Sequence, residues 1–373
     1  MSIEGYATLE GTALYRDRFR ERSAENHFRL EQNLWLSSIG IGTYLGDWDE
    51  ATDARYAEAV ERAVELGVNV IDSAANYRFQ RSERSIGTAL RRLTGELSFS
   101  RAELVICTKG GYLPFDGAPP KNARQYVEET FVKTGIAQFS DIVGGSHCMT
   151  PAYLKHQLGQ SLRNLGINCV DVYYVHNPES QLAHVEREEF DERLRAAFAA
   201  LEHERAEGRL RMYGVATWNG FRVAPDAREY HSLERMTELA REAGGAEHGF
   251  RFVQLPFNLA MPEALVLDNQ TLAGEQVSLL EAARALGVAV VASSSTLQGK
   301  VARGLPARIR EPLGALATDT QTALQFVRST PGITTALIGM SRREHVEENL
   351  RLVRIPPALP EDYQRLFAGQ EEP

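Results

Sequence analysis

The sequence predicts an α/β fold, a (β/α)8 TIM barrel formed by one domain that spans residues 1–373. Eight short runs are rich in Val and Ile and apolar on both faces, as strands covered on both sides are. Helical patterns alternate with these runs, which is typical of a parallel barrel. A doubly wound parallel sheet is the second fold that the alternation allows.

The predicted strands begin after residue 38. They span 39–44, 69–73, 104–109, 170–175, 212–217, 252–257, 288–293 and 335–339. The C-terminal ends of barrel strands meet at one face, where barrel enzymes carry their active sites. We therefore expect polar residues at these ends to share a single mouth.

Amphipathic segments with helical spacing separate the strands. They include 53–67, 151–166, 190–208, 232–245, 276–287, 319–329 and 342–353. In the second of these, Thr150 occupies the expected N-cap, Pro151 the first helical position, and Gly166 the stop.

Residues 1–38 form an extension before the first strand. The pattern of 27–38 predicts a hairpin that turns at Gln32-Asn33 and plugs the bottom of the barrel. The charged run 18–29 is interpreted as a solvated face.

A long insertion, residues 110–149, interrupts the alternation of strands and helices after the third strand, where a short connection is usual. It contains a predicted helix over 122–135, with Asn122 as its cap. The insertion follows a strand's C-terminal end, so it belongs to the catalytic face. A lid, a dimer contact and packing on the barrel all remain open roles for its apolar side.

The composition of the chain limits the classes of partner that we expect it to bind. The net charge of -9 and the pI of about 5.6 argue against nucleic acid or an anionic membrane as the main partner. The chain shows no apolar run of signal-peptide or membrane-spanning type. Cys107, Cys148 and Cys169 are widely spaced, which favours a reduced cytoplasmic protein. Oligomeric state cannot be deduced from these features.

Four residues with acid–base chemistry lie at or just after successive strand ends. Asp72 ends the second strand and Tyr77 follows it, Lys109 ends the third, and His176 follows the fourth. Any one alone would be an ordinary cap or loop residue. Together an acid, a phenol, an ammonium and an imidazole converge on one mouth, as an active site requires.

These four residues, in VIDSAANY, VICTKG and DVYYVHNP, resemble the catalytic tetrad of the aldo-keto reductase superfamily in order and strand placement. The resemblance extends from about Asn33 to Leu352, without the insertion. It implies NAD(P)-dependent reduction of an aldehyde, ketone or sugar carbonyl, or the reverse oxidation of an alcohol.

The chemistry of the four groups agrees with this resemblance. Reducing a carbonyl by hydride transfer needs a proton donor, and tyrosine, with a pKa near 10, is a poor one unaided. The Lys109 ammonium would lower the Tyr77 pKa, Asp72 would hold Lys109, and His176 would orient the carbonyl. Such general acid help is typically worth ~10²–10⁴-fold in rate.

The resemblance also implies a nucleotide site, with NADP(H) favoured over NAD(H) because Arg342 and Arg343 suit a 2′-phosphate. The nicotinamide pair after the fifth strand reads Ala216-Thr217 here, and the stacking aromatic after the seventh strand is absent unless Phe257 or Trp218 supplies it. The predicted cofactor residues are Gly42, Thr43, Thr217, Gln254, Ser294, Leu297, Gly299, Ser341, Arg342, His345, Glu348 and Asn349.

The predicted substrate pocket contains Tyr44, Trp48, Asn177 and Trp218. No metal is expected, because the spacing of His147, Cys148 and His156 matches no strong ligand pattern. The stretch from Gly40 to Gly46 does not have the Rossmann glycine spacing either.

Two other functions remain open on the sequence. One is an isomerase or epimerase that retains its cofactor. The other is a regulatory subunit that binds nucleotide and senses redox state without turnover. For the reductase the expected partner is a small carbonyl or alcohol substrate.

Overall fold

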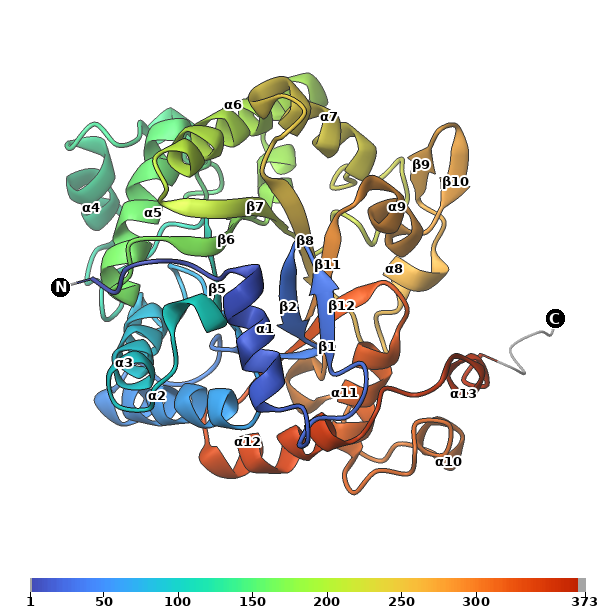
Figure 1. Ribbon diagram of the computed structural model, residues 1–373. Helices are drawn as coiled ribbons and strands as arrows, with labels where there is room; N and C mark the ends of the chain where they lie inside the picture. Colours follow the sequence, from blue (N-terminus) through green and yellow to red (C-terminus); the bar gives the residue numbers. More distant parts are fainter. Residues whose placement is uncertain (1, 368–373) are drawn as a thin grey trace.

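The computed structural model describes residues 2–367, and eight parallel strands close into a barrel (Figure 1). The strands in chain order are β3 (Ile39–Gly42), β4 (Val70–Asp72), β5 (Val105–Gly110), β6 (Val170–His176), β7 (Leu210–Ala216), β8 (Phe250–Pro256), β11 (Ala289–Ser293) and β12 (Ile333–Gly339). Each strand pairs with its neighbour in sequence, and β12 closes the ring on β3. The predicted barrel is confirmed, and the doubly wound alternative is wrong.

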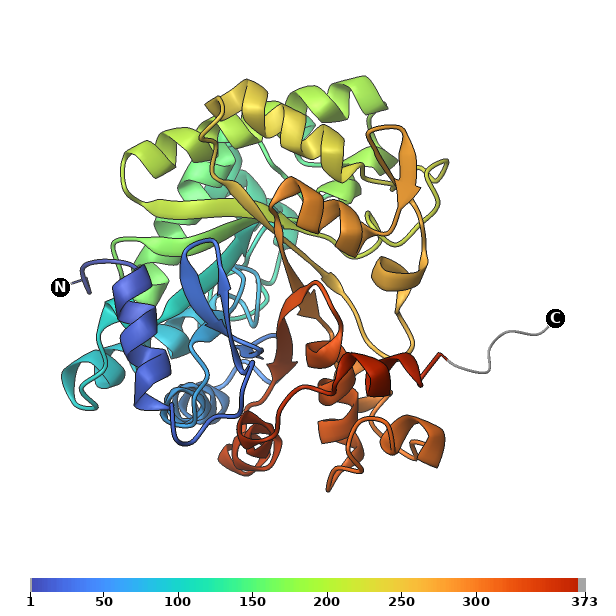
Figure 2. The same cartoon turned by 45° about the vertical axis from the view of Figure 1, so that its right-hand side comes forward.

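Helices surround the barrel, and Figure 2 shows them as an outer layer from a second direction. The long ones are α2 (Glu50–Glu65), α3 (Arg81–Gly95), α5 (Pro151–Leu165), α6 (Arg187–Ala206), α7 (Leu233–Gly244), α9 (Leu279–Leu286) and α11 (Asp319–Ser329). Shorter helices are α8 (Glu263–Val266), α10 (Ala307–Arg310), α12 (Arg343–Asn349) and α13 (Pro360–Gln364). Gly166 ends α5 in the left-handed conformation that a glycine C-cap favours, with φ 68°.

The predicted start of the helix over 276–287 was wrong. Gln276 lies in a short hairpin formed by β9 (Gln270–Leu272) and β10 (Glu275–Val277). Helix α9 begins only after Ser278, whose side chain accepts a hydrogen bond from the Glu281 amide while the Glu281 carboxylate accepts one from the Ser278 amide. This capping box fixes the first turn of the helix more firmly than the apolar pattern does.

The N-terminal hairpin forms as predicted, from β1 (Phe28–Glu31) and β2 (Leu34–Ser37). Gln32 and Asn33 both have positive φ, 50° and 59°, as the tight hairpin turn requires. The Ser37 amide donates to the Asn69 side chain just before β4, at 2.9 Å. The hairpin therefore lies against the N-terminal ends of the strands, away from the catalytic mouth.

A helix that the sequence analysis did not predict, α1 (Leu9–Arg18), precedes the hairpin. The solvated face expected over 18–29 is wrong in part, because Phe19 and His27 are buried. His27 contacts the Gly67 carbonyl oxygen at 2.8 Å, and burial lowers its pKa to about 3. It is therefore a neutral packing residue near neutral pH.

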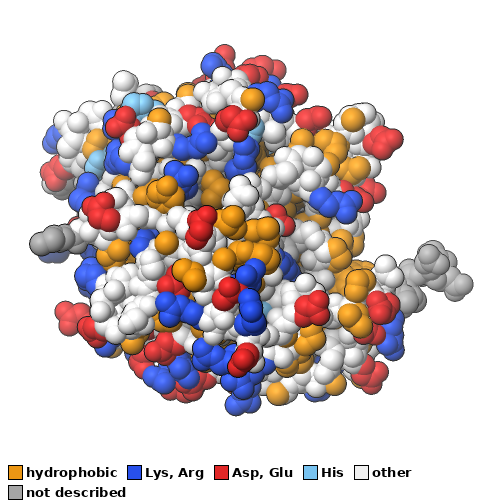
Figure 3. Space-filling model, viewed as in Figure 1, with side chains coloured by type: hydrophobic (Ala, Val, Ile, Leu, Met, Phe, Trp, Pro, Cys, Tyr) orange, Lys and Arg blue, Asp and Glu red, His pale blue; other side chains and the backbone are white. Residues whose placement is uncertain are grey.

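Figure 3 views the molecule from the hairpin side. Basic and acidic side chains are interspersed there, around an apolar group near the centre of the face. No helix within residues 2–367 is long and apolar enough to cross a membrane. The three cysteines are buried and free.

The insertion, 110–149, begins at the C-terminal end of β5. Its predicted helix forms as α4 (Ala123–Val127), capped by the Asn122 side chain, and continues as a π-helical turn over Glu128–Val132. Phe131, with Val127, Cys148 and Tyr153, forms a small apolar cluster separate from the barrel core. The insertion thus has a packing centre of its own.

The barrel tolerates no side chain at Gly214 of β7. A Cβ atom there would lie 1.8 Å from the Phe252 carbonyl oxygen on β8. We expect Gly214→Ala to lower the free energy of unfolding by about 3 kcal/mol or more, because backbone must move. Chemical denaturation measures the change.

Gly95, the last residue of α3, is the matched control, because no atom of residues 2–367 lies within 4 Å of a Cβ built there. Gly95→Ala should leave stability unchanged or raise it by about 0.5 kcal/mol. Equal stability of the two variants would contradict the strand packing described here.

Candidate active site

The four predicted catalytic side chains meet at the C-terminal mouth of the barrel. Asp72 is the last residue of β4, Lys109 lies near the end of β5, and His176 is the last residue of β6. Tyr77 reaches them from the loop after β4 and keeps part of its surface open. The other three are buried.

Asp72 and Lys109 form a buried ion pair, with the Lys109 ammonium donating to Asp72 Oδ1. The ammonium also donates to the Ser73 carbonyl oxygen at 2.7 Å, and Gln254 Nε2 donates to Asp72 Oδ2 at 2.9 Å. Burial acts to lower the Lys109 pKa, but the Asp72 charge and its hydrogen bond raise it overall. Lys109 is therefore a fixed positive charge.

Tyr77 lies beside this charge. The Lys109 nitrogen is 5.1 Å from the centre of the Tyr77 ring. Burial raises the Tyr77 pKa above its ordinary value of 10, and Lys109 opposes that rise. In the free site the phenol is protonated at neutral pH, so it can donate a proton.

His176 contacts Tyr77 edge-on, with ring centres 5.9 Å apart. Burial lowers its pKa well below 6.5, and the Lys109 charge lowers it further. The imidazole is therefore neutral. Its Nδ1 atom is buried and has no hydrogen-bond partner among residues 2–367.

The insertion supplies a residue behind His176 that the sequence analysis did not place in the site. His147 Nε2 lies 2.7 Å from the His176 carbonyl oxygen, and the Gln181 amide nitrogen lies 2.8 Å from His147 Nδ1. Burial lowers the His147 pKa to about 4, so it is neutral. Because Gln181 can only donate from this nitrogen, His147 carries its proton on Nε2 and donates to His176.

The other two positions considered for a metal also have packing contacts. Cys148 Sγ lies 3.4 Å from Thr150 Oγ1, and the His156 ring meets Phe131 edge-on. No group of three or more His, Cys, Asp or Glu side chains in the described part of the chain could hold a metal ion.

Tyr112 is a second insertion residue at the mouth that the sequence analysis missed. Its ring lies 5.2 Å from that of His176, and its hydroxyl accepts a hydrogen bond from Asn177 Nδ2 at 3.2 Å. Its position three residues after Lys109 was the only signal in the sequence. Tyr112 connects the predicted pocket residue Asn177 to the insertion.

The predicted pocket residues differ in their distance from the chemistry. Tyr44 packs on Tyr77, with ring centres 4.9 Å apart, whereas Trp48 packs on Phe79. Trp218 is 43% exposed, and its amide donates to the buried Glu179 carboxylate at 2.5 Å. Exposed aromatic rings at a site mouth suit contact with a ligand, and their role in binding substrate stays a prediction.

The structure defines the surroundings of three residues that were considered for contact with the nicotinamide. Thr217 is buried and its hydroxyl has no partner among residues 2–367, so it can bond to a ligand. The Gln254 amide nitrogen already donates to Asp72, so Gln254 supports the ion pair as well. Phe257 cannot serve as a stacking platform, because it is fully buried and stacks on Phe326. Trp218 is the aromatic candidate that remains.

The predicted phosphate loop follows β11. Ser294, Leu297 and Gly299 all have positive φ, 52°, 44° and 81°, and Leu297–Gly299 form a short 3-10 turn. The Asn258 side chain donates to the Ser294 carbonyl oxygen at 3.0 Å and holds the start of this loop. The loop thus exposes tightly turned backbone, as anion-binding loops do.

The remaining predicted nucleotide residues lie at β12 and α12. Arg342 occupies the N-cap of α12, after Ser341, and is exposed like His345. Arg343 instead pairs with Glu347 at 3.0 Å and Glu58 at 3.6 Å. Asn349 follows Glu348 and has a buried Oδ1 atom with no partner among residues 2–367.

Two predicted cofactor residues at the end of β3, Gly42 and Thr43, have internal contacts. The Thr43 hydroxyl lies 3.2 Å from the Asp72 carbonyl oxygen and 3.0 Å from Ser73 Oγ. Gly42 pairs with Asp72 on one side and Gly339 on the other. Both therefore hold the end of β4 in place, whether or not they touch a cofactor.

Comparison with known proteins agrees with this geometry. The model of the "Aldo/keto reductase family" matches residues 38–307. L-glyceraldehyde 3-phosphate reductase of Escherichia coli is 23% identical over 78% of this chain and 77% of its own length. A Schizosaccharomyces pombe protein assigned as a voltage-gated potassium channel subunit beta is 23% identical over 90% of each chain.

A solved aldo/keto reductase from Klebsiella pneumoniae, in complex with NADP and acetate, has the same fold. Its TM-score is 0.61, with 20% identity over 92% of this chain and 94% of its own. The family match covers seven of the eight barrel strands and all four residues of the tetrad. The chain belongs to the aldo/keto reductase family, a family of NAD(P)H-dependent oxidoreductases.

Proposed function

We propose that this protein reduces an aldehyde, ketone or sugar carbonyl to an alcohol with NADP(H), reversibly. The observation that carries the proposal is the buried Asp72–Lys109 ion pair beside the Tyr77 phenol. That arrangement places a proton donor next to a fixed positive charge, which is what a developing alkoxide needs.

Each side chain has a separate task in this reaction. NADPH, when bound, supplies the hydride to the carbonyl carbon. Tyr77 donates its phenolic proton to the carbonyl oxygen, and Lys109 stabilises the phenolate that results. Neutral His176 is placed to orient the carbonyl oxygen by a hydrogen bond, and Asp72 holds Lys109 in position.

The choice of NADP(H) rests on residues of this chain and on one relative. The buried, unpartnered atoms of Thr217 and Asn349 suit a ligand with polar groups at both of its ends. Arg342 is exposed at the start of α12, whereas Arg343 is held by two glutamates, so Arg342 is the better candidate for a 2′-phosphate. The similar Klebsiella pneumoniae enzyme was solved with NADP.

A nucleotide-binding regulatory subunit is the second candidate. Similarity to a protein assigned as a potassium channel subunit beta, over 90% of each chain, favours it. The assembled tetrad favours a catalyst, and turnover decides between the two.

Removing the Tyr77 hydroxyl should abolish most of the catalysis while NADPH binding is kept. Tyr77→Phe keeps the ring but loses the proton donor, so we expect kcat for carbonyl reduction to fall by ~10²–10⁴-fold. Steady-state NADPH consumption over a panel of aldehydes, ketones and sugars measures it, beside an NADPH titration of both proteins. Tight NADPH binding without turnover by the unaltered protein would favour the regulatory subunit.

The pKa of Tyr77 predicts the pH dependence. Since this pKa is raised above 10, the proton donor persists through neutral pH, and reduction should be nearly constant from pH 6 to pH 9 by this criterion. Alcohol oxidation needs the phenolate and should rise with pH. Lys109 lowers the pKa of Tyr77, so in Lys109→Met the oxidation limb should move to higher pH. If the pH dependence of oxidation were the same in Lys109→Met as in the unaltered protein, the group that titrates would not be Tyr77.

Thr217 offers a test of the cofactor seat. Its hydroxyl has no partner to lose, so Thr217→Val should leave stability unchanged while raising the NADPH Kd about fivefold, the scale of one hydrogen bond. Thr108→Val is the matched control, because the Thr108 hydroxyl donates to the buried Glu83 at 2.6 Å. That change should cost about 1–3 kcal/mol of stability. Unaltered NADPH binding by Thr217→Val would remove Thr217 from the seat.

A further inference from the structure

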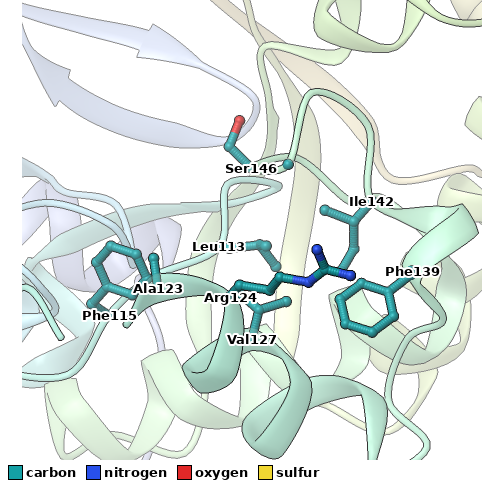
Figure 4. Close-up of a pocket in the computed structure, with 9 residues that line it drawn as sticks. Leu113, Phe115, Ala123, Arg124, Val127, Phe139, Ile142 and Ser146 are labelled. Atoms are coloured by element: carbon teal, nitrogen blue, oxygen red, sulfur yellow. The ribbon is translucent and has the colours of Figure 1, made fainter. Parts of the chain in front are cut away.

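A pocket of 530 Å³ lies within the insertion, apart from the catalytic residues. All of its lining residues come from that one segment: Leu113, Phe115, Ala123, Arg124, Val127, Phe139, Ile142, Gly145 and Ser146. Figure 4 shows the side chains of Leu113, Val127, Ile142 and Phe139 grouped around that of Arg124. The volume of the pocket falls in the range of small-molecule sites, roughly 300–1,000 Å³.

Neighbouring residues of the insertion contact the barrel mouth and the pocket. Tyr112 pairs with His147 in an antiparallel bridge; the Tyr112 ring contacts the rings of both His147 and His176, and His147 bonds the His176 backbone. The next pair, Leu113 and Ser146, is joined by a backbone hydrogen bond of 2.8 Å. Both residues of this second pair line the pocket, whereas none of Asp72, Tyr77, Lys109 and His176 does. The pocket is therefore a site separate from the predicted catalytic residues.

Charge in the pocket has one sign. Among the described residues that line it, Arg124 is the only charged one and Ser146 the only one with an uncharged polar side chain. The two acids nearest along the helix are already engaged, since Glu128 pairs with Lys133 at 3.4 Å and Glu129 accepts from Gln125 at 3.0 Å. The Arg124 guanidinium lies 5.8 Å from the Phe139 ring centre and has no carboxylate partner within residues 2–367. It is free to bind an anion.

The pocket walls have the features of a built site. Leu113 and Ile142 pack on the separate apolar cluster of the insertion, which supports the floor. The wall that contains Val127 continues directly into the π-helical turn over Glu128–Val132, a feature that is frequent at functional sites. Phe139 remains 46% exposed at the rim, so an apolar ligand would cover surface that is otherwise open to water.

We infer that this pocket binds a small amphiphilic carboxylate, with its apolar chain against Leu113, Val127 and Ile142 and its carboxylate on Arg124. The hydrocarbon chain of the ligand would cover the exposed apolar walls of the pocket. Its carboxylate would give Arg124 the anionic partner that it lacks. Guanidinium and carboxylate match in geometry as well as in charge. This second site is independent of the reaction proposed for the tetrad.

Calorimetric titration of the full chain with octanoate and with its neutral analogue octanamide tests the inference. We expect saturable one-site binding of octanoate, with octanamide about fivefold weaker, the scale of an ion pair open to solvent. Arg124→Gln should weaken octanoate about fivefold and remove the preference over octanamide. Lys121→Gln, which removes a nearby exposed cation outside the pocket, should change neither affinity.

Ala123→Trp locates the site, because Ala123 is exposed, lines the pocket and lies at the start of α4. The indole should fill the cavity and weaken both ligands more than tenfold, while the melting temperature and NADPH binding stay unchanged. Octanoate binding that survives this change, an absence of saturable binding, or an equal effect of Lys121→Gln would each overturn the inference. Should Ala123→Trp prove unstable, the comparison of Arg124→Gln with octanamide still decides. If the unaltered protein did not bind NADPH, that result would count against the proposed reductase function. It would not affect the inference about this pocket.

Discussion

The site depends on one buried ion pair, between Lys109 and Asp72. Removing two charges from water is costly, and the cost is offset only when the remaining hydrogen-bonding capacity is satisfied. Here the Ser73 carbonyl oxygen binds the ammonium and Gln254 binds the second carboxylate oxygen. The pair holds a positive charge beside the Tyr77 phenol, and the proposed reaction depends on that charge.

The closed barrel brings together residues from separate strands. Asp72, Lys109 and Gln254 lie on β4, β5 and β8, and Thr43 follows β3. Closure of the sheet brings these strand ends to one mouth, and close strand packing at Gly214 leaves no room for adjustment. The hairpin lies at the opposite end of the barrel, away from these strand ends.

The insertion adds a second layer to the same mouth. Tyr112 and His147 of the insertion contact His176, and other residues of the insertion form the pocket around Arg124. An insertion with an apolar cluster of its own can carry a binding site without disturbing the barrel core. Three of the four predicted catalytic residues lie at strand ends of the barrel, whereas the surroundings of His176 come partly from this segment.

The sequence by itself determined the barrel and the meeting of the four predicted catalytic residues at its mouth. Strand ends are set by local patterns, and parallel closure sends every strand end to one face, so Asp72, Lys109 and His176 could be placed together before any contact was known. Local patterns also gave the turn at Gln32-Asn33 and the cap at Asn122, because such turns and caps involve neighbouring residues. Only the tertiary structure decided the rest. It buried Phe257 against Phe326, turned Gln254 toward Asp72 and brought His147 behind His176, in each case through residues far apart in the chain. Contacts of that kind depend on how the elements pack, which periodicity and capping signals do not encode.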